Sequence, residues 1–338
     1  MKSQLLLCGT QYGQVYLPAI FESQQFELAA LLAKGSARSQ KISQQCGVSL
    51  YADVKTIDEP IDLAVVAIGG EVGATIANDL LAKSIPVLIE HPISVTDLNL
   101  LLSNANKHQT YCHINSHFSH IAPIVDFIKL CQQLNNSSRA HIITVSCNSR
   151  TLFSTLDILM RAFGIFAVSD FNVHPINASG SYQHCIFLLH GIPCNMVYQR
   201  WRSKEDNSKD SPLGHRITVT YPEGVLSLSG TFGPCLWFPL IAAEIPPQVP
   251  LFSALQNNAP PTQVDMIRWR KIANHKSLLD LWNAKCNAIQ PEYQRHEFLT
   301  SLCNNWSLSF NRLSVDIQEY TPQAIDERFW TADSIVRI

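Results

Sequence analysis

A glycine turn follows the first apolar segment of the chain. Residues 4–8 are mostly apolar, and the next five are Gly9, Thr10, Gln11, Tyr12 and Gly13. From Val15 onwards the apolar residues take a helical spacing. Strand, glycine turn and helix open a dinucleotide-binding unit, in which the backbone comes close to a pyrophosphate and helix amides face its charge. The G-x-G-x-x-G pattern is degenerate here, because Cys8 and Thr10 occupy its first two glycine positions, so a turn that binds nothing is the alternative.

A second set of candidate ligands follows the next predicted strand, residues 26–33. The segment contains two cations and two hydroxyls: Lys34, Gly35, Ser36, Ala37, Arg38 and Ser39. An acidic residue at this point usually holds the ribose hydroxyls of NAD and repels a 2′-phosphate. No acid is present, and lysine, arginine and serine side chains bind phosphate well. The sequence therefore predicts NADPH as the cofactor, with a solvated loop as the alternative.

Two further strands are expected to end at the same edge of a parallel sheet. Residues 61–68 are almost entirely apolar, as in a sheet covered on both faces, and they lead to Gly69, where backbone can approach a cofactor. Residues 86–89 lead to Glu90, His91 and Pro92. Ligands of open α/β sheets bind at this carboxyl edge. Helical patterns at 39–46, 72–83 and 94–107 complete a Rossmann domain.

The order of these pieces resembles the glucose-fructose oxidoreductase / inositol dehydrogenase superfamily. In that superfamily the fifth strand ends in Glu-Lys-Pro, and the lysine serves in proton transfer. One branch, the thiazolinyl imine reductases of siderophore biosynthesis, is similar at five stretches of this chain: 8–17, 33–37, 90–92, 224–228 and 231–237.

The resemblance implies a reaction, a partner and an assembly. The reaction is the NADPH-dependent reduction of a thiazoline C=N bond to a thiazolidine. The substrate is a siderophore intermediate tethered by phosphopantetheine to a carrier protein of a nonribosomal peptide synthetase. A homodimer is implied as well.

The histidine in place of the family lysine bears on the type of reaction that the site can catalyse. Sugar-oxidising members need a base, and they also carry an Asp-x-x-x-His pattern on the helix that opens the second domain. When Asp157 is aligned with the aspartate that follows the family histidine, Arg150 and Ser154 occupy those two places. Reduction of C=N needs only a hydride on carbon and a proton on nitrogen, and a histidine can donate that proton near neutral pH. His91 is the first candidate, although it could instead only bond to backbone or to the cofactor amide.

A cluster of histidines follows the sixth predicted strand, residues 110–116. His113 and His117 would share a face of a strand, and His120 would lie beyond its end. No acid is nearby and the spacing matches no standard zinc site, so no metal is predicted. His117 and His120 are further candidate proton donors, and a bound water is a third possibility. Phe118 stands near the place where the family resemblance implies a tyrosine.

Length and composition define the class of protein. With 338 residues, 46% hydrophobic and 15% charged, the chain is predicted to fold as two domains of an enzyme. A net charge of −2 argues against nucleic acid, and no basic or long apolar run indicates a membrane. The apolar run at the start of the sequence is too short for the core of a signal peptide. Ten cysteines without a C-x-x-C spacing favour a reducing, cytoplasmic location.

The predicted domains are a Rossmann NADPH-binding domain at 1–120 and a substrate-binding and dimerisation domain at 121–338. The second is predicted to be α+β, with a mainly antiparallel sheet. It should begin with a helix at 121–134 and regain a helical pattern at 277–302; Trp269, Trp282 and Trp306 are assigned to the core. Strand-like runs lie at 140–147, 165–174, 182–190, 194–202, 214–221 and 224–230, a polar loop at 203–212, and an irregular proline-rich segment at 234–261.

Two other functions remain open at this stage. One is an NADP-dependent oxidoreductase of the same superfamily that acts on a sugar or cyclic diol. The other is a non-catalytic, regulatory protein that binds NADPH.

Overall fold

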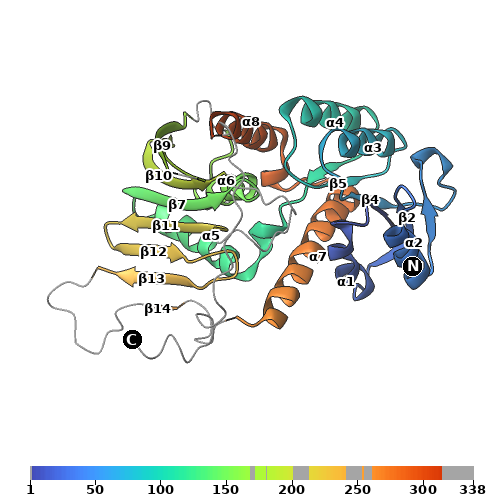
Figure 1. Ribbon diagram of the computed structural model, residues 1–338, viewed down its shortest axis with the longest axis horizontal. Helices are drawn as coiled ribbons and strands as arrows, with labels where there is room; N and C mark the ends of the chain where they lie inside the picture. The colour runs from blue at the N-terminus through green and yellow to red at the C-terminus, as the bar shows by residue number, and fades with distance from the viewer. Residues whose placement is uncertain are drawn as a thin grey trace.

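The computed structural model describes residues 2–167, 172–179, 181–200, 213–240, 253–254 and 261–313. Within them two sheets stand apart, with helices between and around them (Figure 1). The first sheet is parallel, in the order β3-β2-β1-β4-β5-β6. Its strands are β1 (Ser3–Cys8), β2 (Phe26–Leu32), β3 (Ser49–Tyr51), β4 (Leu63–Val66), β5 (Val87–Ile89) and β6 (Cys112–Ile114).

Helices cover both faces of this sheet. They are the 3₁₀ turn η1 (Gly13–Tyr16) with α1 (Leu17–Phe21), then α2 (Ala37–Cys46), the turn η2 (Val54–Thr56), α3 (Gly70–Ala82) and α4 (Val95–Lys107). Neighbouring residues of β1 point to opposite faces, and both faces are buried: Leu6 lies in one apolar cluster and Leu5 in another. Ser94 begins α4 because its hydroxyl accepts the amide of Asp97 at 3.0 Å.

The second sheet has the order β14-β13-β12-β11-β7-β10-β9-β8 and is antiparallel except for the pair β7 and β10. Its strands are β7 (Ile142–Asn148), β8 (His174–Ser179), β9 (Tyr182–Leu189), β10 (Ile192–Gln199), β11 (Arg216–Tyr221), β12 (Gly224–Leu228), β13 (Cys235–Pro239) and β14 (Ser253–Ala254). Buried and exposed residues alternate along β9, so one face packs on the core and the other faces solvent.

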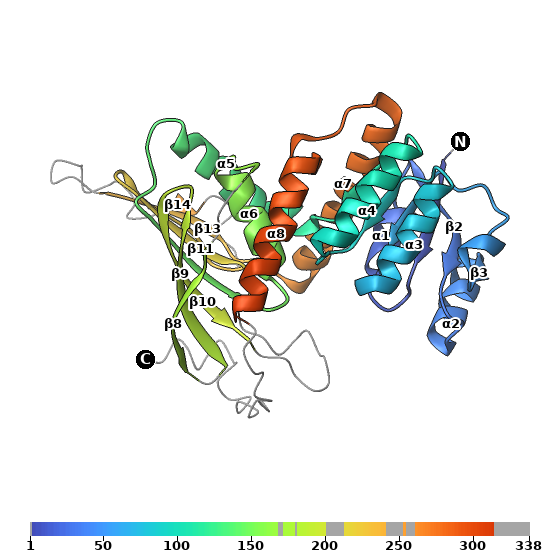
Figure 2. The same ribbon diagram turned by 90° about the horizontal axis from the view of Figure 1, so that it is seen from above.

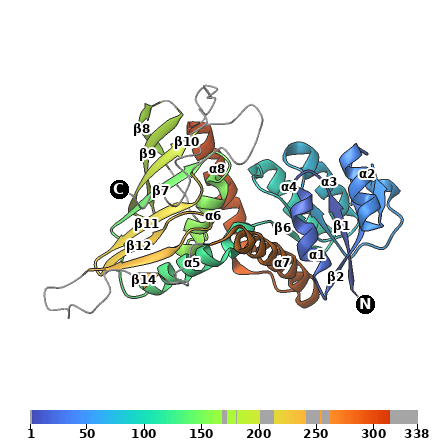
Figure 3. The same ribbon diagram turned by 60° about the horizontal axis from the view of Figure 1, so that its bottom comes forward.

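Four long helices and two short turns connect the sheets. They are η3 (His117–His120), α5 (Ala122–Asn135), α6 (Leu152–Ala162), α7 (Gln263–Asn287), η4 (Glu292–Gln294) and α8 (His296–Leu313). Figures 2 and 3 show α5 and α6 on the inner face of the second sheet, and α8 packs against α6 and α4. Figure 2 also shows α7 and α8 between the two sheets, where α7 packs against α1, β5 and η3.

The predicted fold class is confirmed: a Rossmann domain is followed by an α+β domain whose sheet is mainly antiparallel. Three predicted elements are wrong in detail. Of the described residues in the predicted strand at 165–174, only His174 lies in a strand, where β8 begins. The proline-rich segment contains β13, and the helical region begins at Gln263 instead of 277 and is interrupted between α7 and α8.

Several expectations concern side-chain burial or residues outside the description. Trp269, Trp282 and Trp306 are partly buried and pack against the apolar core clusters. All ten cysteines are free thiols, and eight of them are buried. The predicted loop at 203–212 lies outside the described residues, as do 241–252. No helix in the described part of the chain is long and apolar enough to cross a membrane.

Candidate active site

The carboxyl ends of five neighbouring strands form one edge of the first sheet. The amide of Gly9 donates to Leu32 at 2.8 Å, and the amide of Ala67 donates to Cys8 at 2.8 Å. Gly9 has a φ of +89°, and a Cβ there would lie 2.7 Å from a side-chain carbon of Ile68. Glycine is therefore required at this turn for two reasons, its backbone conformation and the lack of space.

The predicted cofactor ligands lie along this edge. Thr10 and Gly13 are buried, Gln11 is exposed, and Tyr12 is only partly covered, with 42% of its surface exposed. Gly69 precedes α3 as its N-cap, and Glu90, His91 and Pro92 follow β5. These positions lie at the ends of adjacent parallel strands, where dinucleotides bind in this class of fold.

The loop after β2 fits an anionic group. Lys34 and Arg38 are exposed, and neither forms an ion pair with any described residue. Gly35 has a φ of +79° with open space around its Cα, so its backbone is accessible. Ser36 caps α2, because its hydroxyl accepts the amide of Ser39 at 3.3 Å. Two unpaired cations at a helix start are suited to hold a phosphate.

The ring of His91 has a defined orientation. Its Nδ1 lies 2.8 Å from the backbone carbonyl oxygen of Asn115. A carbonyl only accepts, so Nδ1 carries a proton and Nε2 is the nitrogen that gains or loses one. The ring stacks on Phe153 with centroids 5.0 Å apart and an interplanar angle of 13°. No described residue bonds to Nε2, which is therefore available to a ligand.

A buried polar network supports this arrangement. Tyr16 donates its hydroxyl to Oε1 of Glu90, and Nδ2 of Asn115 donates to the same oxygen at 2.8 Å. The Asn115 amide also donates to the Tyr16 oxygen. Burial raises the pKa of Glu90, while the nearby His91 charge opposes that rise. Burial and the Glu90 charge raise the pKa of Tyr16, so its phenol stays protonated as a donor.

The other histidines near β6 are held in the neutral form. Burial, followed by the charge of His91, lowers the pKa of His117 well below its ordinary value. Nδ1 of His117 accepts from Nδ2 of Asn115 at 3.2 Å. His120 pairs with Asp280 at 3.4 Å, yet burial lowers its pKa further than the aspartate raises it. Burial likewise lowers the pKa of His113 to about 4. A neutral histidine is a weak acid, so these three are poorly suited to donate a proton.

Sequence reasoning missed a second buried histidine group. Nε2 of His215 lies 2.6 Å from the hydroxyl of Ser154, and its Nδ1 lies 2.9 Å from that of Thr231. The rings of His215 and Phe118 are 4.6 Å apart, and Phe118 in turn contacts the ring of His91. Ser154, the residue at the family histidine position, therefore bonds to a histidine that directly precedes β11. No spacing in the sequence indicates this pair, because 61 residues separate its members.

The crossover is bonded to a buried ion pair in helix α6 of the second domain. Ser116 donates its hydroxyl to Asp157 at 3.0 Å, and Nε of Arg161 donates to the same carboxylate at 2.8 Å. The guanidinium of Arg161 lies 3.9 Å from the ring centroid of Tyr293. The Asp157 carboxylate therefore has a structural role, because both of its oxygens accept hydrogen bonds. No described group of three His, Cys, Asp or Glu residues could hold a metal ion.

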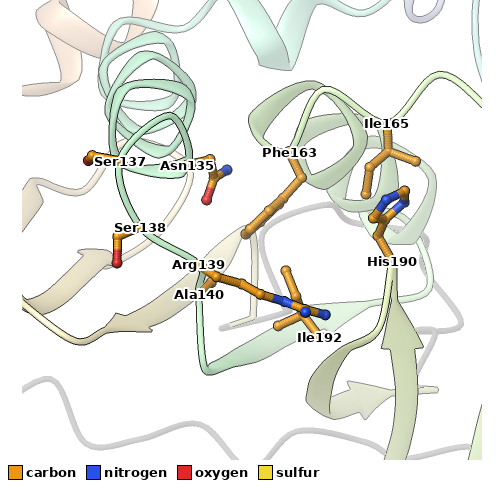
Figure 4. A pocket seen from close by; sticks show the side chains of 9 residues that line it. All are labelled: Asn135, Ser137, Ser138, Arg139, Ala140, Phe163, Ile165, His190 and Ile192. Atoms are coloured by element: carbon orange, nitrogen blue, oxygen red, sulfur yellow. The ribbon is translucent and has the colours of Figure 1, made fainter.

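A cavity of about 670 Å³ lies away from this edge (Figure 4). Residues from the end of α5, the segment after α6 and the turn between β9 and β10 line it, among them Asn135, Arg139, Phe163 and His190. No predicted site residue belongs to it, and we do not assign it to the chemistry.

Two separate stretches of the chain match known protein families. Residues 4–116 match the Gfo/Idh/MocA family, described as an oxidoreductase family with an NAD-binding Rossmann fold. Residues 138–238 match the C-terminal region of Irp3-like thiazolinyl imine reductases. No curated protein matches the chain in sequence.

Solved structures share the whole fold at low identity. A dehydrogenase from Chromobacterium violaceum is 12% identical, with a TM-score of 0.71 over 91% of this chain and 93% of its own. An oxidoreductase from Agrobacterium radiobacter, solved with NAD+, L-tartaric acid and magnesium, is 12% identical, with a TM-score of 0.68 over 93% and 96%. A UDP-N-acetylglucosamine 3-dehydrogenase from Acidithiobacillus ferrooxidans is 12% identical, with a TM-score of 0.68 over 93% and 98%. At such identity the likeness shows the fold alone.

The first part of the chain is therefore similar to Gfo/Idh/MocA oxidoreductases with an NAD-binding Rossmann fold, and a stretch of the second part is similar to the C-terminal region of Irp3-like thiazolinyl imine reductases.

Proposed function

We propose that the protein reduces the C=N bond of a thiazoline to a thiazolidine with NADPH. The observation that carries this proposal is the arrangement of His91, whose Nδ1 is held by Asn115 and whose Nε2 has no partner among the described residues. The match of residues 138–238 to thiazolinyl imine reductases supports the same reaction.

The residues of this chain would divide the work as follows. A reduced nicotinamide held at the edge formed by Gly9, Gly69 and Glu90 would supply the hydride for the thiazoline carbon. His91 would hold a proton on Nε2 and deliver it to the nitrogen of the thiazoline ring. The imidazole of His91 is then neutral, and its Nδ1–H is still bonded to Asn115. Phe153 restricts the tilt of the imidazole ring, and positioning of this kind supplies much of the rate enhancement.

The absence of alcohol-oxidising groups also favours an imine substrate. Arg150 and Ser154 stand where the superfamily resemblance implies aspartate and histidine. Ser154 is bonded to His215, and Asp157 to Arg161, so neither is a free base. A hydroxyl substrate would need a group to accept its proton, whereas an imine needs one to donate.

The choice of NADPH rests on the loop after β2. Lys34 and Arg38 offer two exposed cations, and no carboxylate follows that strand to repel a 2′-phosphate. A carrier protein that presents the substrate on phosphopantetheine is proposed as a transient partner.

We also propose a homodimer formed through the second sheet. Its solvent face carries large apolar side chains that no described element covers, namely Ile176, Tyr182, Ile186, Leu188 and Val197. Exposed apolar surface of this extent is typical of an interface.

A substrate comparison tests the proposed reaction. Oxidation of NADPH should be followed with a thiazoline thioester and with the free thiazoline carboxylate, and reduction of NADP+ should be followed with a panel of sugars and cyclic diols. We expect turnover on thiazolines alone. Turnover on a polyol in place of a thiazoline would assign the chain to the sugar oxidoreductases, and tight NADPH binding without turnover would favour a regulatory protein.

A further inference from the structure

Arg270 is a cation that lies where the two domains meet. It belongs to the first half of α7, and its guanidinium carbon lies 5.1 Å from the ring centroid of Phe232 in the turn between β12 and β13. Trp269 stacks on the same ring, with centroids 6.5 Å apart and an interplanar angle of 19°. Stacking on an aromatic face fixes the plane of the guanidinium and leaves its N–H groups at the rim.

The same stretch of α7 is attached to the glycine turn of the first domain. One turn after Arg270, Nδ2 of Asn274 donates to the backbone oxygen of Val15 at 3.1 Å. Two electrostatic effects agree with this position. The Arg270 charge contributes to lowering the pKa of His117 and opposes the rise that burial causes in the pKa of Tyr12. Helix α7, which carries Arg270, therefore packs against both the turn η1 of the first domain and the histidine segment η3 after β6.

No described carboxylate forms an ion pair with Arg270. Three lysines of α7 have partners: Lys271 with Glu22, Lys276 with Asp280 and Lys285 with Asp62. An exposed arginine held on an aromatic ring is pre-organised for a planar or tetrahedral anion, because little side-chain entropy remains to be lost.

We propose that Arg270, supported by Phe232 and Trp269, binds an anionic group of the substrate next to the position where His91 acts. The group is a carboxylate or the phosphate of a phosphopantetheine arm, two sources of the same chemistry. This inference rests on the proposed function for the identity of the substrate, but the anion site can be tested without turnover.

The test is calorimetric binding to the full chain saturated with NADP+. Thiazoline carboxylate is compared with its carboxamide, and phosphopantetheine with pantetheine, so that each pair differs only in charge. The variants are Arg270→Gln and Arg270→Lys, with Arg268→Gln, another exposed arginine of α7, as the matched control.

We expect the wild type and Arg268→Gln to prefer the anionic member of one pair by about tenfold or more, as charge-assisted hydrogen bonds provide. Arg270→Gln should lose that preference, and Arg270→Lys should retain part of it. The pair that responds identifies the source of the anion.

Two results would overturn the anion site. One is an equal preference for the anionic member in Arg270→Gln and Arg268→Gln. The other is a weakening of NADP+ binding in Arg270→Gln as large as the loss of ligand affinity, which would assign the arginine to the cofactor. If the binding preference depends on Arg270 while no thiazoline is reduced, the anion site stands and the proposed reaction falls.

Discussion

Nδ1 of His91 and the backbone oxygen of Asn115 are 2.8 Å apart, so a main-chain atom determines the tautomer of the candidate acid. The amide of Asn115 is itself bonded to the end of β5 at 2.7 Å, through the oxygen of Ile89. Its side chain reaches Glu90 and His117. One residue of the crossover thus connects the sheet, the buried carboxylate and the imidazole.

Substitution of His91 should separate chemistry from cofactor binding. In His91→Asn the amide can replace Nδ1 but leaves nothing at Nε2, whereas in His91→Gln it reaches the Nε2 position without an acidic proton. We expect both to slow hydride transfer by about 10²- to 10⁴-fold in single-turnover measurements, with NADPH affinity within about twofold of wild type. His120→Gln is the control, because His120 is turned to Asp280. A rate unchanged in both His91 variants would remove this residue from the mechanism.

The loop after β2 should decide between the two nicotinamide cofactors. Lys34→Ala and Arg38→Ala each remove one exposed cation, and each charge-assisted contact with a phosphate contributes about 1.5–3 kcal/mol. We expect each variant to weaken NADPH by about 10- to 100-fold while NADH affinity changes little, as measured by fluorescence titration.

Lys41→Ala provides the control for that comparison, because Lys41 is an exposed cation further along α2. An equal loss of affinity for both cofactors in Lys34→Ala and Arg38→Ala would argue against recognition of the 2′-phosphate.

Parallel strands explain how much of the site the sequence predicts. Apolar runs in the sequence predict the strands, and the carboxyl ends of parallel strands lie at the same edge of a sheet. The residues that follow those runs, among them Gly9, Lys34, Gly69 and His91, can therefore be placed at one edge from the sequence. Local signals also predict caps, as Ser94 does for α4.

Polar contacts between residues far apart in the sequence produce no pattern from which they could be predicted. Tyr16 and Glu90 are 74 residues apart, and Asn115 lies 99 residues from Tyr16, so neither pairing follows from spacing. Arg270 was missed because α7 packs against both domains: its apolar residues point to two sides and give no single amphipathic stripe. Strand β13 was missed because prolines at both ends of the segment suggested an irregular loop.

Removal of the buried carboxylate of Asp157 should destabilise the protein strongly. Asp157 is 1% exposed and Arg161 is 7% exposed, so Asp157→Asn leaves an unpaired buried charge. Breaking such a pair costs about 3–5 kcal/mol of unfolding free energy. Urea denaturation should show this loss, whereas Lys271→Gln, which breaks the exposed pair with Glu22, should cost less than about 1 kcal/mol. Losses of similar size in the two variants would contradict the assignment of the buried pair.

His113 should make the fold sensitive to acid. The residue is 1% exposed, its Nε2 has no partner among the described residues, and burial lowers its pKa from 6.5 to about 4. Below pH 6.5 His113 is protonated in the unfolded chain but is still neutral in the folded protein. Stability from this residue is therefore fully present above pH 6.5 and is lost as the pH falls towards 4, by up to about 3 kcal/mol.

Replacement of His113 by leucine removes this proton linkage. Between pH 6.5 and 4, His113→Leu should lose less unfolding free energy than the wild type does, measured by denaturant titrations at several pH values. The exposed His190, in the turn after β9, is the matched control, and His190→Asn keeps its left-handed backbone favourable at a φ of 51°. The control should follow the wild-type curve. Parallel curves for His113→Leu and the wild type would show that the ring is protonated as easily in the folded protein as in the unfolded chain.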